Sequence, residues 1–265
     1  MSTARNGAFE LAFDVEGQGP SLLLVAGTAA TRPLWALVRP SLNAGFSTIA
    51  FDNRDSGDST IASQAYAFAD LAADAAAVLD AAGVQRAHVV GHSMGGVIAQ
   101  EFALRYPQRC TSLTLICSWA RTDAYARNAI GLMQALCAGD CDERTLLAAI
   151  LWAGAGTATL QEVDLWEWTD AAMALGPLPP RAALVRQWQL DLQVNTLDRL
   201  PKLNVPTHVI WCDQDHFIPQ PLSRQLLDAI SNARETRIAA CGHSPMVHRP
   251  DELSKAIAGF LSEVE

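Results

Sequence analysis

The segment VVGHSMGGVIAQ places Ser93 between Gly91 and Gly95, after an apolar run and before a helical pattern. A serine hydroxyl becomes a useful nucleophile only when a base takes its proton and its oxygen stands clear of the chain. Glycines on both sides of a strand-to-helix turn let the two elements approach closely, so the serine can occupy a strained, exposed position. The segment predicts a nucleophile at Ser93. An ordinary small-residue turn is the alternative, because G-x-S-x-G also arises by chance.

An acid and a base follow further along the chain. The stretch THVIWCDQDHFIPQP is an apolar strand pattern followed by Asp213 and Asp215, and ETRIAACGHSPMVH is a strand pattern followed by His243. A histidine can accept the serine proton, and a carboxylate can orient that histidine. We therefore expect Ser93, Asp215 and His243 to act together as a catalytic triad. Asp213 and Asp123 remain alternatives for the acid.

A backbone amide and a second histidine extend the predicted site. The helix expected to begin at about Met94 aims free N–H groups and a positive dipole end toward the place where an oxyanion would form. His92 occupies the variable position of the serine turn, and we expect it to contact the substrate. The other histidines are interpreted as structural, loop or surface residues: His88, His208, His216 and His248.

The elements that must position these residues alternate along the chain. Apolar strand patterns occupy residues 21–27, 46–52, 87–93, 111–118, 207–213 and 235–241. Helical patterns lie at residues 34–45, 68–83, 95–107, 221–233 and 250–264. This alternation, with strands that are apolar throughout, predicts a mostly parallel sheet covered on both faces. The alternating stretch FELAFDVEGQGP near the start predicts an antiparallel edge strand.

The alternation stops between residues 118 and 194, where every pattern is helical. Five of the seven tryptophans fall in this interval. We predict a helical cap at 118–194, inserted between two parts of the core at 1–117 and 195–265. Trp119 and Trp152 are candidate substrate contacts, although each tryptophan could instead hold the small helices together.

Composition excludes several classes of function. The chain has 265 residues, of which 50% are hydrophobic, and its formal charge is −9 without any basic run, so a nucleic-acid partner is not expected. It shows neither a secretory signal nor an apolar membrane span, and we expect a cytoplasmic monomer or homodimer. The six cysteines are interpreted as reduced. No second pair completes a metal site around Cys137 and Cys141, so no metal is expected.

The sequence resembles the α/β-hydrolase family, in particular the small capped serine esterases and lactonases that include 3-oxoadipate enol-lactonases and polyketide methylesterases. The similarity lies in GHSMGG, FDNRDSGDS, NTLDRLPKLNVPTHVI, DQDHFIP and GHSPMVHRPDEL. It implies an α/β-hydrolase fold, with a mostly parallel eight-stranded sheet, helices on both faces and an inserted helical cap. It also implies a nucleophile at Ser93, a base at His243 and an acid at Asp215, whose D-x-x-x-P loop ends at Pro219.

The resemblance further implies an oxyanion hole formed by the backbone amides of Met94 and Thr28. Relatives usually have His-Gly before the second amide, whereas this chain has Ala26 and Gly27, and Gly27 is expected to border the substrate. Asp55 stands where many members of the family have glycine. Arg54 and Asp55 are interpreted as a loop ion pair or turn, without a chemical role.

These inferences predict hydrolysis of a carboxylic ester or lactone through an acyl-enzyme, without a cofactor. The apolar, tryptophan-bearing cap favours a small to mid-sized hydrophobic substrate, such as a compound of secondary metabolism. The same triad would also serve carbon–carbon bond hydrolysis, perhydrolysis or acyl transfer to another acceptor, because the shape of the pocket decides among these reactions. A protein that binds or cyclises a small ligand without hydrolysis is an alternative from another class.

Overall fold

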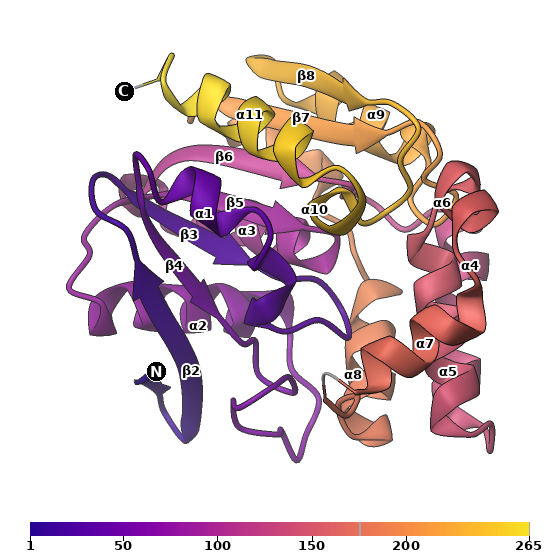
Figure 1. Ribbon diagram of the computed structural model, residues 1–265. Helices are drawn as coiled ribbons and strands as arrows, with labels where there is room; N and C mark the ends of the chain where they lie inside the picture. The colour runs from indigo at the N-terminus through magenta and orange to yellow at the C-terminus, as the bar shows by residue number, and fades with distance from the viewer. Residues whose placement is uncertain (175, 265) are drawn as a thin grey trace.

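A mostly parallel sheet forms the body of the computed structural model, which describes residues 1–174 and 176–264 (Figure 1). Its strands are β1 (Ser2–Asn6), β2 (Phe9–Glu16), β3 (Ser21–Val25), β4 (Ser47–Phe51), β5 (Ala87–His92), β6 (Cys110–Ile116), β7 (Thr207–Cys212) and β8 (Ala233–Ile238). Their order is β1-β2-β4-β3-β5-β6-β7-β8. Neighbouring strands from β4 to β8 are parallel, and β1 and β2 are antiparallel at one edge. The predicted fold class is confirmed.

Helices cover both faces of the sheet. They are α1 (Arg39–Leu42), α2 (Phe68–Ala81), α3 (Met94–Arg105), α9 (Gln220–Ala229), α10 (Pro245–His248) and α11 (Pro250–Leu261). Successive residues of a strand point to opposite faces, so Leu23 and Val25 of β3 belong to the cluster that contains residues of α2, α3 and α9. Leu22 and Leu24 belong to the opposite cluster, with residues of α1 and α11. Burial on both faces explains why the strands are apolar throughout.

Five further helices lie between β6 and β7, and they are called the cap helices below. They are α4 (Ala124–Ala138), α5 (Glu143–Gly154), α6 (Thr157–Glu162), α7 (Leu165–Met173) and α8 (Arg181–Asp191). Aspartates at 123, 142 and 164 accept hydrogen bonds from the first-turn amides of α4, α5 and α7, which fixes where these helices begin. Figure 1 shows the cap helices beyond the carboxyl ends of the central strands, where parallel sheets place their ligand sites.

Two details of the core differ from the sequence prediction. The expected edge strand, β2, is an interior strand, because the short polar strand β1 pairs with it and Ala4 lies opposite Leu11. The helix expected over residues 34–45 is reduced to the 3₁₀ turn Arg32–Trp35, named η1, and the single turn α1. Pro33 and Pro40 each begin one of these turns, because proline fits only the first turn of a helix.

Among residues 1–174 and 176–264, no helix combines the length and the apolar character that crossing a bilayer requires. The longest of them, α4, has 15 residues.

Candidate active site

Ser93 occupies a sharp turn between β5 and α3. Its backbone has φ 55° and ψ −122°, a strained conformation for a residue with a side chain. A Cβ on Gly91 would lie 2.2 Å from the Gly95 carbonyl oxygen, and one on Gly95 would lie 2.2 Å from the Val25 carbonyl oxygen. Only glycine therefore permits this approach of strand and helix, which holds Ser93 at the end of the sheet.

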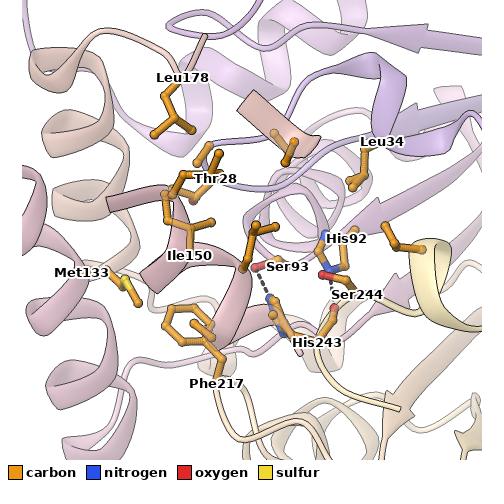
Figure 2. A pocket seen from close by; sticks show the side chains of 18 of the residues that line it. Thr28, Leu34, His92, Ser93, Met133, Ile150, Leu178, Phe217, His243 and Ser244 are labelled. Atoms are coloured by element: carbon orange, nitrogen blue, oxygen red, sulfur yellow. Dashed lines mark hydrogen bonds between the residues drawn. The ribbon is translucent and has the colours of Figure 1, made fainter. Parts of the chain in front are cut away.

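The structure brings Ser93, His243 and Asp215 together in one hydrogen-bonded chain. Figure 2 shows the contact between Ser93 and His243. His243 Nε2 lies 2.9 Å from Ser93 Oγ, and His243 Nδ1 lies 2.7 Å from Asp215 Oδ2. Asp215 Oδ1 accepts hydrogen bonds from the amides of Phe217 (2.9 Å) and Ile218 (2.8 Å), so the carboxylate orientation is fixed. A carboxylate only accepts, so His243 carries its proton on Nδ1, and Nε2 is free to accept from the serine.

The two alternative acids have other partners. Asp213 Oδ2 accepts a hydrogen bond of 2.6 Å from the exposed side chain of Arg237. Asp123 caps the amino terminus of α4 by accepting from the Ala126 amide. Of the three candidate carboxylates, Asp215 is the one that contacts His243.

The loop after β3, residues 26–31, lies directly against the serine turn and is called the oxyanion loop below. A Cβ on Gly27 would lie 3.0 Å from Ser93 Cβ and 3.1 Å from the His92 carbonyl oxygen. Gly27 thus permits the close approach of the loop, but it is not among the residues that line the cavity described below. The amides of Thr28 and Met94 donate no hydrogen bond to any residue of the described ranges. Both are therefore free to donate a hydrogen bond to a ligand oxygen.

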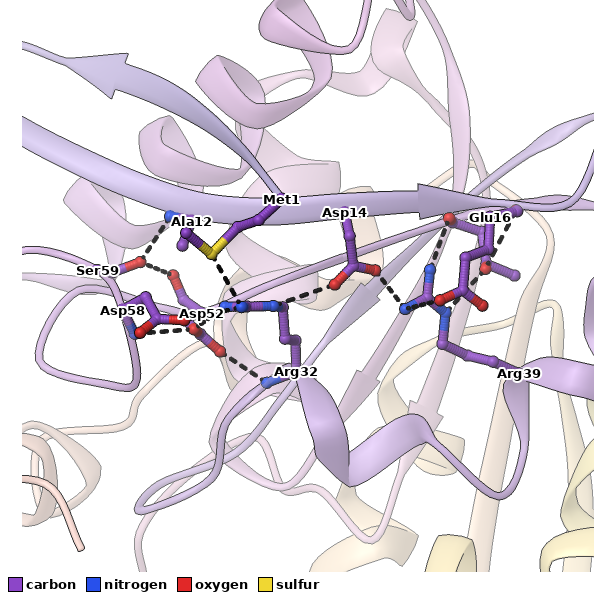
Figure 3. A network of polar contacts seen from close by, with 10 residues as sticks. Met1, Ala12, Asp14, Glu16, Arg32, Arg39, Asp52, Asp58 and Ser59 are labelled. Atoms are coloured by element: carbon purple, nitrogen blue, oxygen red, sulfur yellow. Dashed lines mark hydrogen bonds and ion pairs between the residues drawn. The ribbon is translucent and has the colours of Figure 1, made fainter. Parts of the chain in front are cut away.

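A network of carboxylates holds the end of the oxyanion loop (Figure 3). The guanidinium of Arg32, the first residue of η1, contacts Asp14 on β2 (3.0 Å), Asp58 (2.8 Å) and Asp52. The Arg32 amide also donates to Asp52 Oδ1 over 2.7 Å. This anchor fixes η1, and therefore the direction of the loop before it, against β2 and the segment that follows β4.

The cap helices and the core enclose a cavity of about 350 Å³ that opens onto Ser93 and His243. Its wall is mainly apolar, with Leu34, Met133, Leu147, Ile150, Leu178 and Phe217 contributing side chains. Figure 2 shows five of them, Leu34, Met133, Ile150, Leu178 and Phe217, around Ser93. No aspartate, glutamate, lysine or arginine occurs among the lining residues of the described chain.

The tryptophans are distributed differently from the prediction. Trp119 is 1% exposed, packs in the main core and donates from Nε1 to Thr122, so it does not reach the cavity. Trp152 is 50% exposed and packs against the ring of His216 in a tilted arrangement, outside the cavity. Trp168 and Trp188 line the cavity instead. All four side chains belong to helical or loop patterns. The sequence does not indicate which face of a short helix borders the cavity, so it could not separate these tryptophans.

His92 lines the cavity, and it also contacts His243. Its Nε2 lies 2.7 Å from the His243 carbonyl oxygen, so the Nε2 proton is donated to that oxygen. Burial, together with the nearby His243, lowers the pKa of His92 to about 3. His92 is therefore a neutral side chain at physiological pH.

Arg54 and Asp55 do not pair with each other, contrary to one sequence interpretation. Arg54 donates to both carboxylate oxygens of Asp74 on α2. Asp55, with φ 68°, is fully buried and accepts two hydrogen bonds of 2.7 and 2.9 Å from Arg186 on α8. The position where many relatives have glycine thus provides an ionic contact between the core and a cap helix.

One group of donor atoms near the site has the composition of a metal site. Cys117 Sγ and ligand atoms of Asp215 and His243 lie within 4.8 Å of one another. Burial raises the pKa of the Cys117 thiol to about 11, so the thiol stays protonated and is a poor ligand. The Asp215 and His243 atoms are already bonded to each other. This group is better suited to supporting the triad acid than to holding an ion.

Comparisons with known proteins agree with the fold. A family model described as alpha/beta hydrolase fold matches residues 20–147. Over 271 residues the chain is 28% identical to a protein of Azorhizobium caulinodans named as a carbamate hydrolase, RutD, with all of both chains covered. It is 30% identical over 261 residues to a Mycobacterium tuberculosis protein named as a non-heme bromoperoxidase, BpoC, covering 96% of this chain and 98% of that one.

Solved structures of similar proteins share the fold. The crystal structure of BpoC superposes with a TM-score of 0.87 at 27% identity, covering 96% of each chain. The enol-lactonase of Burkholderia xenovorans has a TM-score of 0.88 at 19% identity, covering 98% of this chain and all of that one. At that lower identity the likeness concerns the fold alone.

Proposed function

The chain belongs to the α/β-hydrolase family, and we propose that it is a serine hydrolase that cleaves a carboxylic ester or lactone of a small to mid-sized, uncharged substrate. The observation that carries this proposal is the hydrogen-bonded chain from Asp215 through His243 to Ser93, which ends at an apolar cavity. Each of the three groups has the protonation and the direction that nucleophilic attack on a carbonyl requires.

In the proposed mechanism, His243 Nε2 takes the proton of Ser93 as Ser93 Oγ bonds to the carbonyl carbon. The carbonyl π electrons move to the oxygen, and the amides of Met94 and Thr28 donate to that oxyanion. His243 then gives its proton to the leaving alcohol oxygen as the carbon–oxygen bond breaks. Asp215 holds the Nδ1–H tautomer and stabilises the imidazolium that forms in both steps. Water, activated by His243 in turn, hydrolyses the acyl-enzyme.

The wall of the cavity supports this substrate class. A cavity of about 350 Å³ suits a small to mid-sized acyl group, and its aliphatic and aromatic lining favours apolar surface. An ionised group on the substrate would be buried there without a counter-charge, which is unfavourable by several kcal/mol. We therefore expect uncharged esters to be preferred over esters that carry a carboxylate on the acyl chain.

Hydrolysis of a carbamate is a second candidate, supported by the full-length similarity to RutD. A carbamate carbonyl accepts the same attack by Ser93, and the same two amides would stabilise its oxyanion. The apolar cavity favours a carbamate with an apolar substituent over a small polar one.

The proposal is tested with p-nitrophenyl esters of increasing acyl length, a matched ester that carries a terminal carboxylate, and a phenyl carbamate. We expect hydrolysis of the apolar esters, which is lost in Ser93→Ala and kept in Ser231→Ala, an exposed serine before β8. A fluorophosphonate probe should add its phosphonyl mass to the peptide that contains Ser93. Unchanged hydrolysis in Ser93→Ala would falsify the role of Ser93. An inert wild type that is stabilised by apolar ligands would indicate a binding protein.

A further inference from the structure

The oxyanion loop makes a tight turn over residues 27–30, beside the serine turn. The Ala30 amide donates to the Gly27 carbonyl oxygen over 3.3 Å, which closes the turn. Of the two central residues, Thr28 and Ala29, only Ala29 has a positive φ, of 59°. A positive φ at the third residue alone is the pattern of a type II turn, which favours glycine or asparagine there. Alanine is unfavourable in this left-handed conformation, because its Cβ comes close to a carbonyl oxygen.

A type I turn could span the same four residues without a positive φ. The two types of turn differ in the peptide between the central residues, which is rotated by roughly half a turn. The N–H of that peptide belongs to Ala29, and it donates to Gln187 Oε1 over 2.9 Å. In a type I turn this N–H would point away from Gln187, and the hydrogen bond would be lost. Gln187 therefore contacts the one group whose direction distinguishes the two turns.

Gln187 lies on the cap helix α8, and its side chain is fully buried against the core. Its Nε2 donates to the Ser56 hydroxyl oxygen over 2.9 Å. A backbone N–H only donates, so the side-chain atom that faces Ala29 is the amide oxygen. The preceding residue, Arg186, forms the ion pair with Asp55 described above, so α8 is fixed against the core at this point.

The other central residue of the turn, Thr28, is contacted from the same helix. Asp191 is one helical turn beyond Gln187, and its Oδ2 lies 2.5 Å from the Thr28 hydroxyl oxygen. Side chains of one cap helix thus contact both central residues. The Thr28 amide is the expected oxyanion donor, so its direction depends on the conformation of a turn that the cap holds.

We propose that Gln187 is a positioning residue for the oxyanion hole, because by accepting from the Ala29 amide it keeps the turn in the type II form. The inference rests on the proposed function, since it concerns the oxyanion formed by attack of Ser93. The strain of a left-handed alanine and the contribution of one hydrogen bond are of similar size, so without Gln187 both forms of the turn would be populated. Oxyanion donors are effective because they are oriented before the charge develops. A donor on a turn that moves between two forms is less effective.

The loss should appear in kcat rather than in KM. Gln187 is not among the described residues that line the cavity, so its substitution leaves the wall that binds the substrate in place. Donation to the oxyanion stabilises the transition state and not the bound substrate. Weakening of that donation therefore lowers kcat and leaves KM nearly unchanged.

The test is a double-mutant cycle on p-nitrophenyl ester hydrolysis, with the wild type, Gln187→Met, Ala29→Gly and the double variant. Methionine has a similar size but no amide, and we expect Gln187→Met to lose about tenfold in kcat with little change in KM. Glycine adopts a positive φ without strain, so the type II turn then depends less on Gln187. In the Ala29→Gly background, Gln187→Met should lower kcat by less than about threefold.

Gln225→Met is the matched control. Gln225 on α9 also accepts from a loop amide, that of Arg121 over 3.0 Å, but this loop is not the oxyanion loop. We expect Gln225→Met to keep the wild-type kcat. Hydrogen exchange gives a readout that does not require activity. The peptide that contains residues 26–31 should exchange faster in Gln187→Met, because the Ala29 amide loses its acceptor, and should be unchanged in Gln225→Met.

Each outcome decides one part of the inference. A kcat of Gln187→Met within about twofold of the wild type contradicts the positioning role, and unchanged exchange of residues 26–31 contradicts the hold on the turn. Equal losses of kcat with and without Ala29→Gly contradict the left-handed alanine as the reason. If Gln187→Met does not fold, Gln187→Asn replaces it in the cycle, since it keeps a buried amide but withdraws it from Ala29 by one methylene group. A wild type that hydrolyses no ester overturns the proposed function instead, and hydrogen exchange still tests the contact.

Discussion

The ring of His92 donates from Nε2 to the backbone carbonyl of His243 over 2.7 Å, and the two ring centroids lie 4.9 Å apart. This contact ties the loop that carries the candidate base to the turn that carries the candidate nucleophile. His92 immediately precedes Ser93, so one residue connects two segments that are 150 positions apart in the sequence.

Removal of the His92 ring should weaken catalysis without changing the acid-side pH dependence. One hydrogen bond contributes about 1 kcal/mol, so His92→Ala should lower kcat about fivefold to tenfold. The pKa of His92 is about 3, so His92 is already neutral where the acid limb of kcat/KM is expected. The measurement is a kcat/KM profile from about pH 5 to 8 for both proteins. A shift of the acid-side midpoint by about one pH unit or more would show that His92 titrates in this range.

Substitution of the two acidic residues after β7 should have very different effects. Asp215→Asn leaves His243 without the carboxylate that selects its tautomer, and we expect kcat to fall by about 10³- to 10⁴-fold. Asp213 contacts the exposed Arg237 side chain, and His243 is paired with Asp215 instead, so Asp213→Asn should keep wild-type kcat. Steady-state rates on one ester, with circular dichroism to confirm folding, make the comparison. Equal losses in both variants would contradict the assignment of the acid.

The ion pair between Asp55 and Arg186 should contribute strongly to stability. Arg186→Met leaves the fully buried Asp55 carboxylate without its partner, which should lower the free energy of unfolding by about 3 kcal/mol. Arg144→Met removes a similar pair with Asp170 that lies in solvent, and it should change stability little. Urea unfolding followed by tryptophan fluorescence gives both values. Equal stability of the two variants would show that the buried pair is not important.

Two glycine-to-alanine substitutions should change the free energy of unfolding in opposite directions. A Cβ at Gly95 meets the Val25 carbonyl oxygen at 2.2 Å, so Gly95→Ala should destabilise the fold by about 3 kcal/mol or more. Gly131, inside α4, has no atom within 4 Å of an added Cβ, and Gly131→Ala should stabilise by about 0.5 to 1 kcal/mol. The measurement is the melting temperature of each variant relative to the wild type, obtained by thermal unfolding. An intact, active Gly95→Ala protein is incompatible with the described packing of the serine turn.

Asp191, the last residue of α8, is 1% exposed, and it should make the stability of the protein depend on pH. Its pKa is about 8 in the folded protein and about 4 in an unfolded chain, so the folded state binds the proton more tightly. The contribution of this proton to the free energy of unfolding is complete below about pH 4, and it is lost as the pH rises toward about 8. We expect the wild type to lose stability relative to Asp191→Asn over that interval, measured by urea unfolding at several pH values. A constant difference would mean that Asp191 is not protonated in the folded protein.

Much of the site could be predicted because its parts have local signatures. The turn around Ser93 needs glycines at fixed positions, and the candidate acids and the base each follow an apolar strand, so spacing indicates where they lie. Spacing left Asp213 and Asp123 open beside Asp215, and only the structure shows that Asp215 is the carboxylate in contact with His243. Trp119 and Trp152 could not be assigned in this way. The inward face of a short cap helix depends on packing with helices that are distant in sequence, and the same tryptophan suits a core, a surface or a cavity wall.

The sequence by itself determined the alternation of the central strands and helices, the glycine-flanked serine turn and the strand patterns that the candidate acids and the base follow, since these depend on periodicity and on local backbone sterics. Only the tertiary structure decided what surrounds them. The pairing of β1 with β2, the contact of Asp55 with Arg186 and the placement of Asp191 behind Thr28 each join segments that are distant in the chain. Burial removes charges and hydroxyl groups from water, so these groups need hydrogen-bond or ionic partners within the protein, and the packing of distant segments determines which partners they find.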